Sequence, residues 1–444
     1  MSKRICVFPA LDSPYDRKMC EDFAAGLCFN GHEVFAAKRP INDEKLGDFV
    51  TENNLHTVIR INKFPPSERK KYQRYRHISW FQDVFPSTGQ IQVDFLDGDS
   101  IVTLGSAENL GLNIGREYYQ GSFSLYINPD DFKNIKIPLL KKYDANIIGF
   151  IPRLPTELAQ NESRFLNGMS PNGKRALIFK KVALMRLSQL LAYHSGELVR
   201  SLKTLRFEKF NQATLQRILM HYREAFSAFY VSEPSSSLSV GANLISKQYE
   251  ALAGNLDCGA LEEHLDNEFK NLGRELEHGL RDYLVRELPR YIDRYELASR
   301  MLKLSANVSI CGNNWSFLNL CDGYDTRSVS FKQSLDIFAN SKITLQNNNH
   351  GIGLHSRTLS AMASGGFVLS HTSPRDEDPG GLLTVFDVDK HLGLFDRQNF
   401  EEVVLRWLRN DTDRNKVVAA ARNLVLEQFN WNVGASHFAK QVNL

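Results

Sequence analysis

The chain has 444 residues, of which 42% are hydrophobic and 24% are charged, and its formal net charge at pH 7 is only +3. These values are typical of a globular protein with room for two or three domains. The small net charge gives no indication of a nucleic-acid partner.

The six cysteines, at positions 6, 20, 28, 258, 311 and 321, form no C-x-x-C pair and no Cys/His cluster. Such spacing argues against structural zinc and against a disulfide framework, so we expect reduced thiols. The N-terminal apolar run is short and soon followed by charge, and no stretch of about 18 apolar residues follows it. The sequence therefore predicts a cytoplasmic protein with neither a signal peptide nor a membrane span.

The first part of the chain alternates short apolar runs with turns. Apolar runs at 4–10 and 30–38 flank a stretch with helical spacing. This βαβ pattern predicts a parallel sheet and hence an α/β fold. Further strands are expected at 56–62, 76–83, 99–106 and 121–132. We predict one Rossmann-like domain at 1–140, on the acceptor side of the molecule.

The middle of the chain has a different period. From about 155 to 300 the apolar residues recur at intervals of three and four, as in Leu184, Leu187 and Leu191. This period predicts a large helical insertion, which a Ser/Pro/Gly loop at 232–243 interrupts.

Alternation of strands and helices resumes at residue 307. Residues 307–315 are expected to be a strand that leads into a glycine turn, and residues 342–353 a strand that leads into a polar loop. A further strand is expected at 367–370, and helices are expected at 356–364, 399–410 and 412–428. We predict a second Rossmann-like domain at 141–428, which contains the insertion and binds the nucleotide. The last residues, 429–444, are predicted to form a helix that returns to the first domain.

The stretch HSRTLSAMASGGFVLS, residues 355–370, is the main candidate for a ligand site. With Ser356 as its N-cap, a helix here places Arg357, Ser360 and Ser364 on one face. In open α/β sheets, ligands lie outside the carboxyl ends of the strands, where helix N-termini favour anions. A guanidinium at that place can donate two parallel hydrogen bonds to a diphosphate. The alternative is that Arg357 pairs with a surface carboxylate.

Several segments, in this order, resemble GT-B glycosyltransferases, especially the spore-maturation (CgeB-like) group. They are WFQD, DSIVTLGSAENL, YYQGSFSLYINPDDF, DANIIGFIP, SICGNNW, RTLSAMASGGFVLSHTSP and the region from 386 to 431. The resemblance implies the GT-B fold, with two Rossmann-like domains facing a cleft. It also implies metal-independent, hexosyltransferase-type transfer of a sugar from a nucleotide-diphosphate donor. No cofactor is expected, because the nucleotide sugar is a co-substrate.

We expect the donor to be bound by residues of the second domain. They are Arg357, Ser360, His350, His355, Asn348, Gly351, Gly353, Gly312, Asn313, Trp315, Gly365 and Gly366. Gly365 and Gly366 are also expected to end the helix. The two histidines could contact phosphate or sugar, or be structural, and Trp315 could offer a stacking face or belong to the core.

The sequence departs from the family at the ribose site. Ser360 stands where the family usually places a glutamate, and Gly353, seven residues earlier, replaces the other glutamate of many retaining enzymes. A serine makes a neutral hydrogen bond, which is weaker than the charge-assisted bonds of a carboxylate.

An inverting transfer needs a general base on the first domain. Asp83 is our first candidate, because its neighbours Trp80 and Phe81 would desolvate it and raise its pKa. Asp12 and Asp16, after the first strand, are further candidates. Asp83 could instead cap the turn that follows it. Asp12 could likewise be a turn residue, because it stands directly before a Ser-Pro pair. No Asp-x-Asp pair stands at a strand end, and we interpret residues 97–99 as a turn and predict no metal site.

Residues 60–77 concentrate lysine, arginine and tyrosine. This run could attract an anionic acceptor or the inner face of a membrane, or it could be the solvated face of a helix. The acceptor could be a glycan, a lipid-linked glycan or a protein. Two other functions stay open: a nucleotide-sugar-binding protein without turnover, and a GT-B-type sugar-nucleotide epimerase.

Overall fold

The computed structural model describes residues 4–66, 75–82, 95–107, 110, 112, 114–115, 117–150, 288–313, 315, 329–346, 354–373, 376–396 and 398–444. The chain divides into two compact units. The larger comprises Met1–Ile148, Leu297–Cys311 and Leu320–Leu444, and the smaller comprises Gly149–Glu296 and Gly312–Asn319. The predicted insertion at 155–300 lies outside the described residues, apart from part of helix α9 (Leu288–Leu304).

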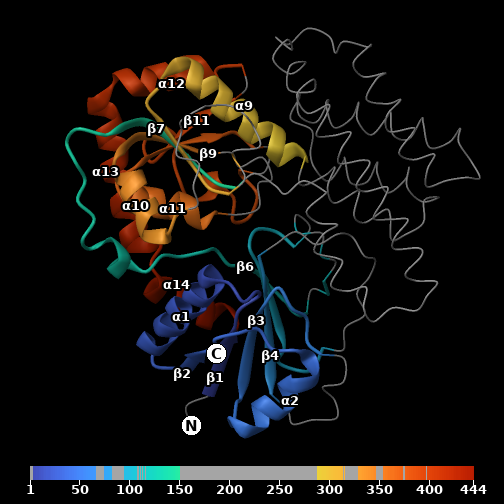
Figure 1. Cartoon of the computed structure of the whole chain (residues 1–444). Helices are drawn as coiled ribbons and strands as arrows, with labels where there is room; N and C mark the ends of the chain where they lie inside the picture. The colour runs from blue at the N-terminus through green and yellow to red at the C-terminus, as the bar shows by residue number, and fades with distance from the viewer. Residues whose placement is uncertain are drawn as a thin grey trace, which may run out of the picture. The chain divides into compact units, whose positions relative to one another are not determined.

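The larger unit contains a first, six-stranded parallel sheet with the order β2-β1-β3-β4-β5-β6 (Figure 1). Its strands are β1 (Arg4–Phe8), β2 (Glu33–Ala36), β3 (Thr57–Ile61), β4 (Arg76–Phe81), β5 (Ser100–Thr103) and β6 (Tyr119–Ser122). Helices α1 (Pro14–Phe29) and α2 (Asp43–Glu52) connect the first three strands. The strand order reverses between β1 and β3, so the carboxyl ends of these strands form a switch point.

A second parallel sheet has the order β11-β10-β9-β7-β8. Its strands are β7 (Tyr143–Ile148), β8 (Val308–Cys311), β9 (Ser341–Gln346), β10 (Phe367–His371) and β11 (Gly393–Phe395). Its helices are α9, α10 (Phe331–Ala339), α11 (Ser356–Ala363), α12 (Phe400–Arg409) and α13 (Asp411–Gln428), with short 3-10 helices η3 (Pro129–Phe132) and η7 (Leu382–Thr384) nearby. The switch point here lies between β7 and β9. The predicted α/β fold with two parallel sheets is confirmed.

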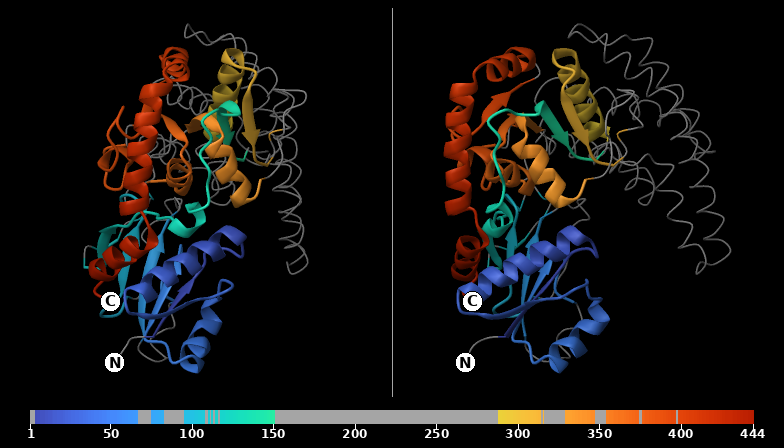
Figure 2. Two further views of the ribbon diagram at one scale, coloured as in Figure 1. Left: turned by 90° about the vertical axis from the view of Figure 1, so that its left-hand side faces the viewer. Right: turned by 60° about the vertical axis from the view of Figure 1, so that its left-hand side comes forward.

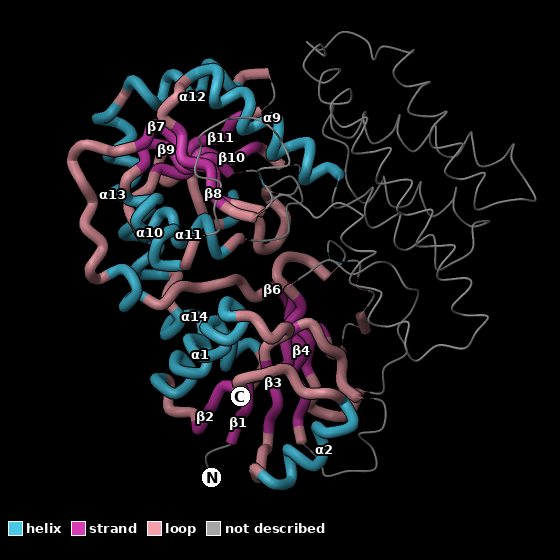
Figure 3. The backbone as a smooth tube through the Cα atoms, in the orientation of Figure 1, coloured by secondary structure: helices cyan, strands magenta, loops and turns pink. Residues whose placement is uncertain are grey.

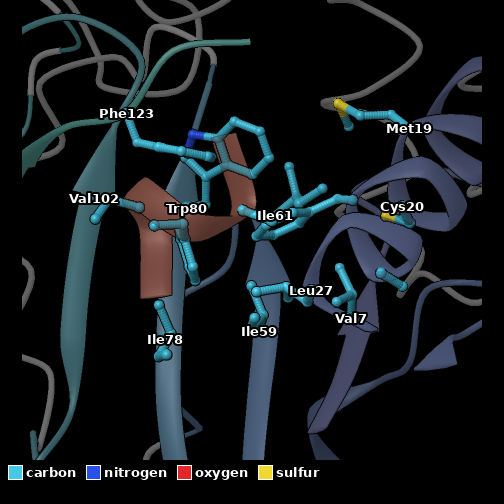
Figure 4. Packing of buried hydrophobic residues seen from close by; sticks show 14 of the residues in the cluster. Val7, Met19, Cys20, Leu27, Ile59, Ile61, Ile78, Trp80, Val102 and Phe123 are labelled. Atoms are coloured by element: carbon cyan, nitrogen blue, oxygen red, sulfur yellow. The ribbon is translucent and has the colours of Figure 1, made fainter. Parts of the chain in front are cut away.

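Helix α14 (Trp431–Gln441) packs against α1 and completes the core of the first sheet (Figure 2). An aromatic cluster joins the two helices to the strands, with ring centroids 4.9 Å apart for both Phe23–Phe438 and Trp80–Phe123. Figure 4 shows Trp80 and Phe123 side by side within this core. A Cβ on Gly26 of α1 would lie 2.4 Å from the carbonyl oxygen of Trp431, so the two helices approach closely because residue 26 is glycine.

Two details differ from the sequence-based expectations. The predicted strand at 121–132 is a short strand, β6, which ends at Ser122 and is followed later by η3. The basic run at 60–77 is not one helix face: Arg60 lies in β3, is 2% exposed and pairs with Asp43 at 2.7 Å, and Arg76 lies in β4. The described part of the chain contains no helix long and apolar enough to span a membrane.

Candidate functional site

Helix α11 is the next described element after β9, which borders the switch point of the second sheet. His355 is the N-cap, one residue before the expected Ser356, and its Nδ1 accepts a hydrogen bond from the Arg357 backbone N–H at 3.4 Å. The first backbone N–H groups of a helix lack partners within it and carry partial positive charge. This end of α11 therefore favours an anion.

Arg357 brings a full positive charge to the same place. The side chain is half-buried, and its guanidinium forms no hydrogen bond or ion pair with any other residue that the structure describes. Burial lowers the pKa of Arg357, and the nearby Tyr15 opposes this effect. An arginine nevertheless stays protonated at neutral pH, so its charge is partly desolvated and has no counter-ion among the described residues. Such a group is suited to receiving an anionic ligand.

A buried amide lies at the end of β9. Gln346 is 8% exposed, and its Oε1 accepts a hydrogen bond from the hydroxyl of Thr358 at 2.6 Å. Its Nε2 is buried and has no partner among the residues with described positions. Because an unpaired buried N–H costs free energy, this group is a candidate donor to a ligand. Neither Gln346 nor Thr358 was predicted as a site residue from the sequence, although Gln346 can be recognised there as the polar residue that ends a buried strand.

The first turn of α1, the helix that follows β1, contacts the start of α11. The hydroxyl of Tyr15, in the first turn of α1, donates to the Ser356 hydroxyl at 2.9 Å. A Cβ on Gly380, which follows β10, would lie 3.1 Å from the Cα of Gly105, which follows β5. Both contacts lie within the larger compact unit. The first of them places the region around the start of α1 next to the start of α11.

Asp12 and Asp16 lie in this region and have local partners. The Asp16 backbone N–H donates to the Ser13 hydroxyl at 3.0 Å, and that hydroxyl donates to the Asp16 carboxylate. Asp16 thus belongs to the N-terminal cap of α1. Asp12 pairs with Arg17 and, at 3.5 Å, with Arg39.

The small residues of α11 face the protein interior. Ser360 is 6% exposed and Ser364 is fully buried, so neither shares an exposed face with Arg357. Gly365 and Gly366 end the helix, as expected from the sequence: their N–H groups donate to Met362 at 3.0 Å and to Ala361 at 2.9 Å. An eight-residue helix is about 12 Å long, so both glycines lie far from its N-terminus.

Gly312, Asn313 and Trp315 belong to the smaller compact unit. Trp315 is 3% exposed, and its indole N–H donates to the Gly149 carbonyl oxygen at 2.8 Å. A Cβ on Gly312, whose φ is +133°, would lie 1.5 Å from the same oxygen. These contacts give Gly312 and Trp315 a structural role in their own unit.

Five residues named from the sequence, Asp83, Asn348, His350, Gly351 and Gly353, lie outside the described residues. The predicted turn at 97–99 is present, and the Asp99 carboxylate accepts backbone N–H bonds from His77 at 2.9 Å and Leu96 at 2.8 Å. Within the described ranges, no three His, Cys, Asp or Glu side chains are grouped as a metal would require.

Comparison with known proteins gives one family match. A family model described as "Glycosyl transferase-like" matches residues 286–439, a range that includes α11. No curated protein sequence matches the chain.

Among solved structures, a glycosyltransferase from Rickettsia africae aligns with a TM-score of 0.48 at 10% identity, over 100% of this chain and 98% of that one. HepE of Anabaena in complex with UDP-glucose has a TM-score of 0.48 at 8% identity, over 99% of each chain. The sucrose-phosphate synthase of Thermosynechococcus elongatus has a TM-score of 0.45 at 8% identity, over 99% of this chain and 98% of that one.

Proposed function

We propose that the protein is a metal-independent glycosyltransferase of GT-B architecture, which moves a sugar from a nucleotide-diphosphate donor to an acceptor. The observation that carries the proposal is the half-buried guanidinium of Arg357 at the N-terminus of α11, which has no hydrogen-bond or ion-pair partner among the described residues. The family match over 286–439 supports it, because the matched range contains this helix. The finer assignments, to the CgeB-like group and to hexosyl transfer, rest on the resemblance of the sequence.

The guanidinium of Arg357 and the positively polarised N-terminus of α11 are proposed to hold the diphosphate, while the backbone N–H groups of Arg357 and Thr358 donate to His355. As the bond between sugar and diphosphate breaks, negative charge grows on the leaving oxygen, and these fixed donors stabilise it more than they stabilise the ground state. Gln346 would donate to the donor its amide N–H, which has no partner among the described residues, and the buried Ser360 would offer no carboxylate at the place of the family's glutamate. His355, Asn348, His350, Gly351 and Gly353 complete the proposed donor site.

A carboxylate of the first sheet is proposed to accept the acceptor's proton. Asp83 remains the first candidate, since Asp12 has arginine partners and Asp16 caps α1. Asp83 follows β4, whose last residues Trp80 and Phe81 are fully buried. The acceptor is proposed to be a glycan, a lipid-linked glycan or a protein.

The proposal is tested with a thermal-shift panel of UDP, GDP, TDP, ADP and CMP. A ligand that binds the native state stabilises it by about 2.7 kcal/mol when its concentration is 100 times its Kd. We expect one nucleoside diphosphate to raise the Tm, Arg357→Ala to abolish that rise, and Arg357→Lys to retain part of it. A rise that survives Arg357→Ala would contradict the placement of the diphosphate.

A nucleotide-sugar-binding protein without turnover is the second candidate, because Ser360 replaces the ribose-binding carboxylate. Hydrolysis of nucleotide sugars without acceptor distinguishes the two, since turnover supports an enzyme and binding alone supports the silent protein. Asp83→Asn should leave the thermal shift unchanged and lower turnover at least about a hundredfold, as loss of a general base does. Unchanged turnover would remove Asp83 as the base.

A further inference from the structure

The loop between η3 and β7 exposes an unusual amount of apolar surface. Leu139 is 102% exposed, Leu140 is 89% exposed and Ile137 is 42% exposed. Figure 3 draws this stretch as a loop without helix or strand. Exposed leucines are common one at a time, whereas two adjacent ones at the tip of a loop form an apolar knob.

The chain around this knob is basic. Residues 132–143 read FKNIKIPLLKKY, with four lysines and no acidic residue, although Lys133 pairs with Asp130 at 2.6 Å just before this stretch. Lys136 and Lys142 are exposed, and Lys142 lies over the ring of Tyr143 at 4.9 Å. Arg422 adds a positive charge nearby, where its Nε donates to the Ala363 carbonyl oxygen at 3.0 Å.

The knob is held at both of its ends. Lys141 donates to the carbonyl oxygen of Ala339, the last residue of α10, at 2.6 Å, and to that of Gly365 at 3.4 Å. Ile137 packs against Gly365, where a Cβ would lie 2.4 Å from the Ile137 Cδ1. Burial at this anchor lowers the pKa of Lys141 to about 8. The tip therefore presents its leucines without first having to become ordered.

We propose that Leu139, Leu140 and the flanking lysines bind the surface of an anionic lipid bilayer. Leucine side chains enter the boundary between headgroups and acyl chains, while lysines remain at the level of the anionic headgroups. Paired apolar and cationic contacts on a short loop favour weak, reversible binding. A second copy of this chain is disfavoured as the occupant, because two identical lysine-rich loops repel each other.

The test is co-sedimentation of the full chain, without nucleotide, with vesicles of phosphatidylcholine alone or with about 30% phosphatidylglycerol. We expect binding to the anionic vesicles only, and weaker binding when salt rises from 0.1 M to 1 M, which shortens the Debye length from about 10 to about 3 Å. Leu139→Ser with Leu140→Ser should lower the partition coefficient at least about tenfold. Lys136→Gln with Lys142→Gln should weaken binding and flatten its salt dependence.

The matched control is Phe29→Ser. Phe29 is 74% exposed at the end of α1, and residues 25–33 contain no lysine or arginine, so this variant should sediment as the wild type does. Equal sedimentation of the double leucine variant and the wild type would overturn the proposal. So would a concentration-dependent dimer in analytical ultracentrifugation that the leucine substitutions abolish. Because no nucleotide is present, failure here leaves the proposed sugar transfer untouched.

Discussion

At the scale of single residues, the charge of Arg357 favours the binding of an anion but lowers the stability of the folded protein. Its guanidinium is desolvated and has no counter-ion in the described part of the chain. Replacing unpaired buried charge with an apolar side chain of similar length is often neutral or stabilising. We expect Arg357→Met to leave the free energy of unfolding unchanged or to raise it by about 1–3 kcal/mol in urea titrations without ligand.

Arg300 provides the control for that substitution. Its Nε donates to the Glu401 carboxylate at 2.7 Å, and the side chain forms an ion pair with the same group. Arg300→Met should lower the free energy of unfolding by about 1–2 kcal/mol, because it removes a paired cation. A loss of stability in Arg357→Met as large as in Arg300→Met would mean that Arg357 is a structural residue.

Asp376 predicts a pH dependence of stability. It is 3% exposed, the Ser373 backbone N–H donates to its Oδ2 at 2.7 Å, and its Oδ1 has no partner among described groups. Burial, and to a lesser extent Glu377, raises the pKa of Asp376 from 3.8 to about 6. The folded state thus binds the Asp376 proton more tightly than the unfolded state does. The stability that this proton provides is complete below pH 3.8 and is lost as the pH rises to about 6.

Asp376→Asn should remove this loss. An amide keeps the acceptor for Ser373 and carries no charge, so at pH 7.5 we expect up to about 3 kcal/mol more stability than in the wild type, and little difference at pH 4. Urea titrations at both pH values measure this, with Glu52→Gln, at an exposed position at the end of α2, as the control. An equal effect at the two pH values would contradict a raised pKa.

At the scale of elements, the contact between α1 and α14 depends on Gly26. The missing Cβ leaves room for the Trp431 backbone, which would otherwise lie 2.4 Å from it. We expect Gly26→Ala to cost about 1–3 kcal/mol by overpacking, although alanine is the better helix former. Thermal unfolding measures the loss, and Ala25→Ser on the exposed side of α1 should change stability by less than about 0.5 kcal/mol. A stabilised Gly26→Ala would show that α14 can move aside.

The central strands of both sheets could be predicted from short apolar runs because they are buried and continuous, whereas α2, α10 and the short edge strand β11 were not predicted. Strands β3, β4, β9 and β10 all lie within the predicted ranges or within one residue of them. The site was harder, because burial depends on packing between distant segments. Sequence spacing placed Ser360 beside Arg357, but it could not show that α11 buries Ser360, or that Thr358 bonds to Gln346 twelve residues earlier. The contact of Tyr15 with Ser356 joins positions 341 residues apart, which no local pattern reveals.

At the scale of the whole molecule, the last helix contributes to the core of the first sheet. Phe438 is fully buried, and its ring centroid lies 4.9 Å from those of Phe23 and Phe123. Phe438→Ala should cost about 3–5 kcal/mol, which denaturant titration measures. His437→Ala, a substitution at a neighbouring exposed-face position of the same helix, should have a much smaller effect. Equal losses for the two variants would mean that α14 does not stabilise the sheet through its apolar face.

Because helix α14 is translated last, the hydrophobic core of the first sheet is completed only at the end of synthesis on the ribosome. Strands β1 to β6 emerge early, but Trp431, Ala435, Phe438 and Val442, which close their hydrophobic core, are translated some 300 residues later. At about 5–20 residues per second, the nascent sheet waits roughly 15 to 60 seconds with apolar side chains uncovered. During that interval, the growing polypeptide is a natural client for chaperones that shield such surfaces.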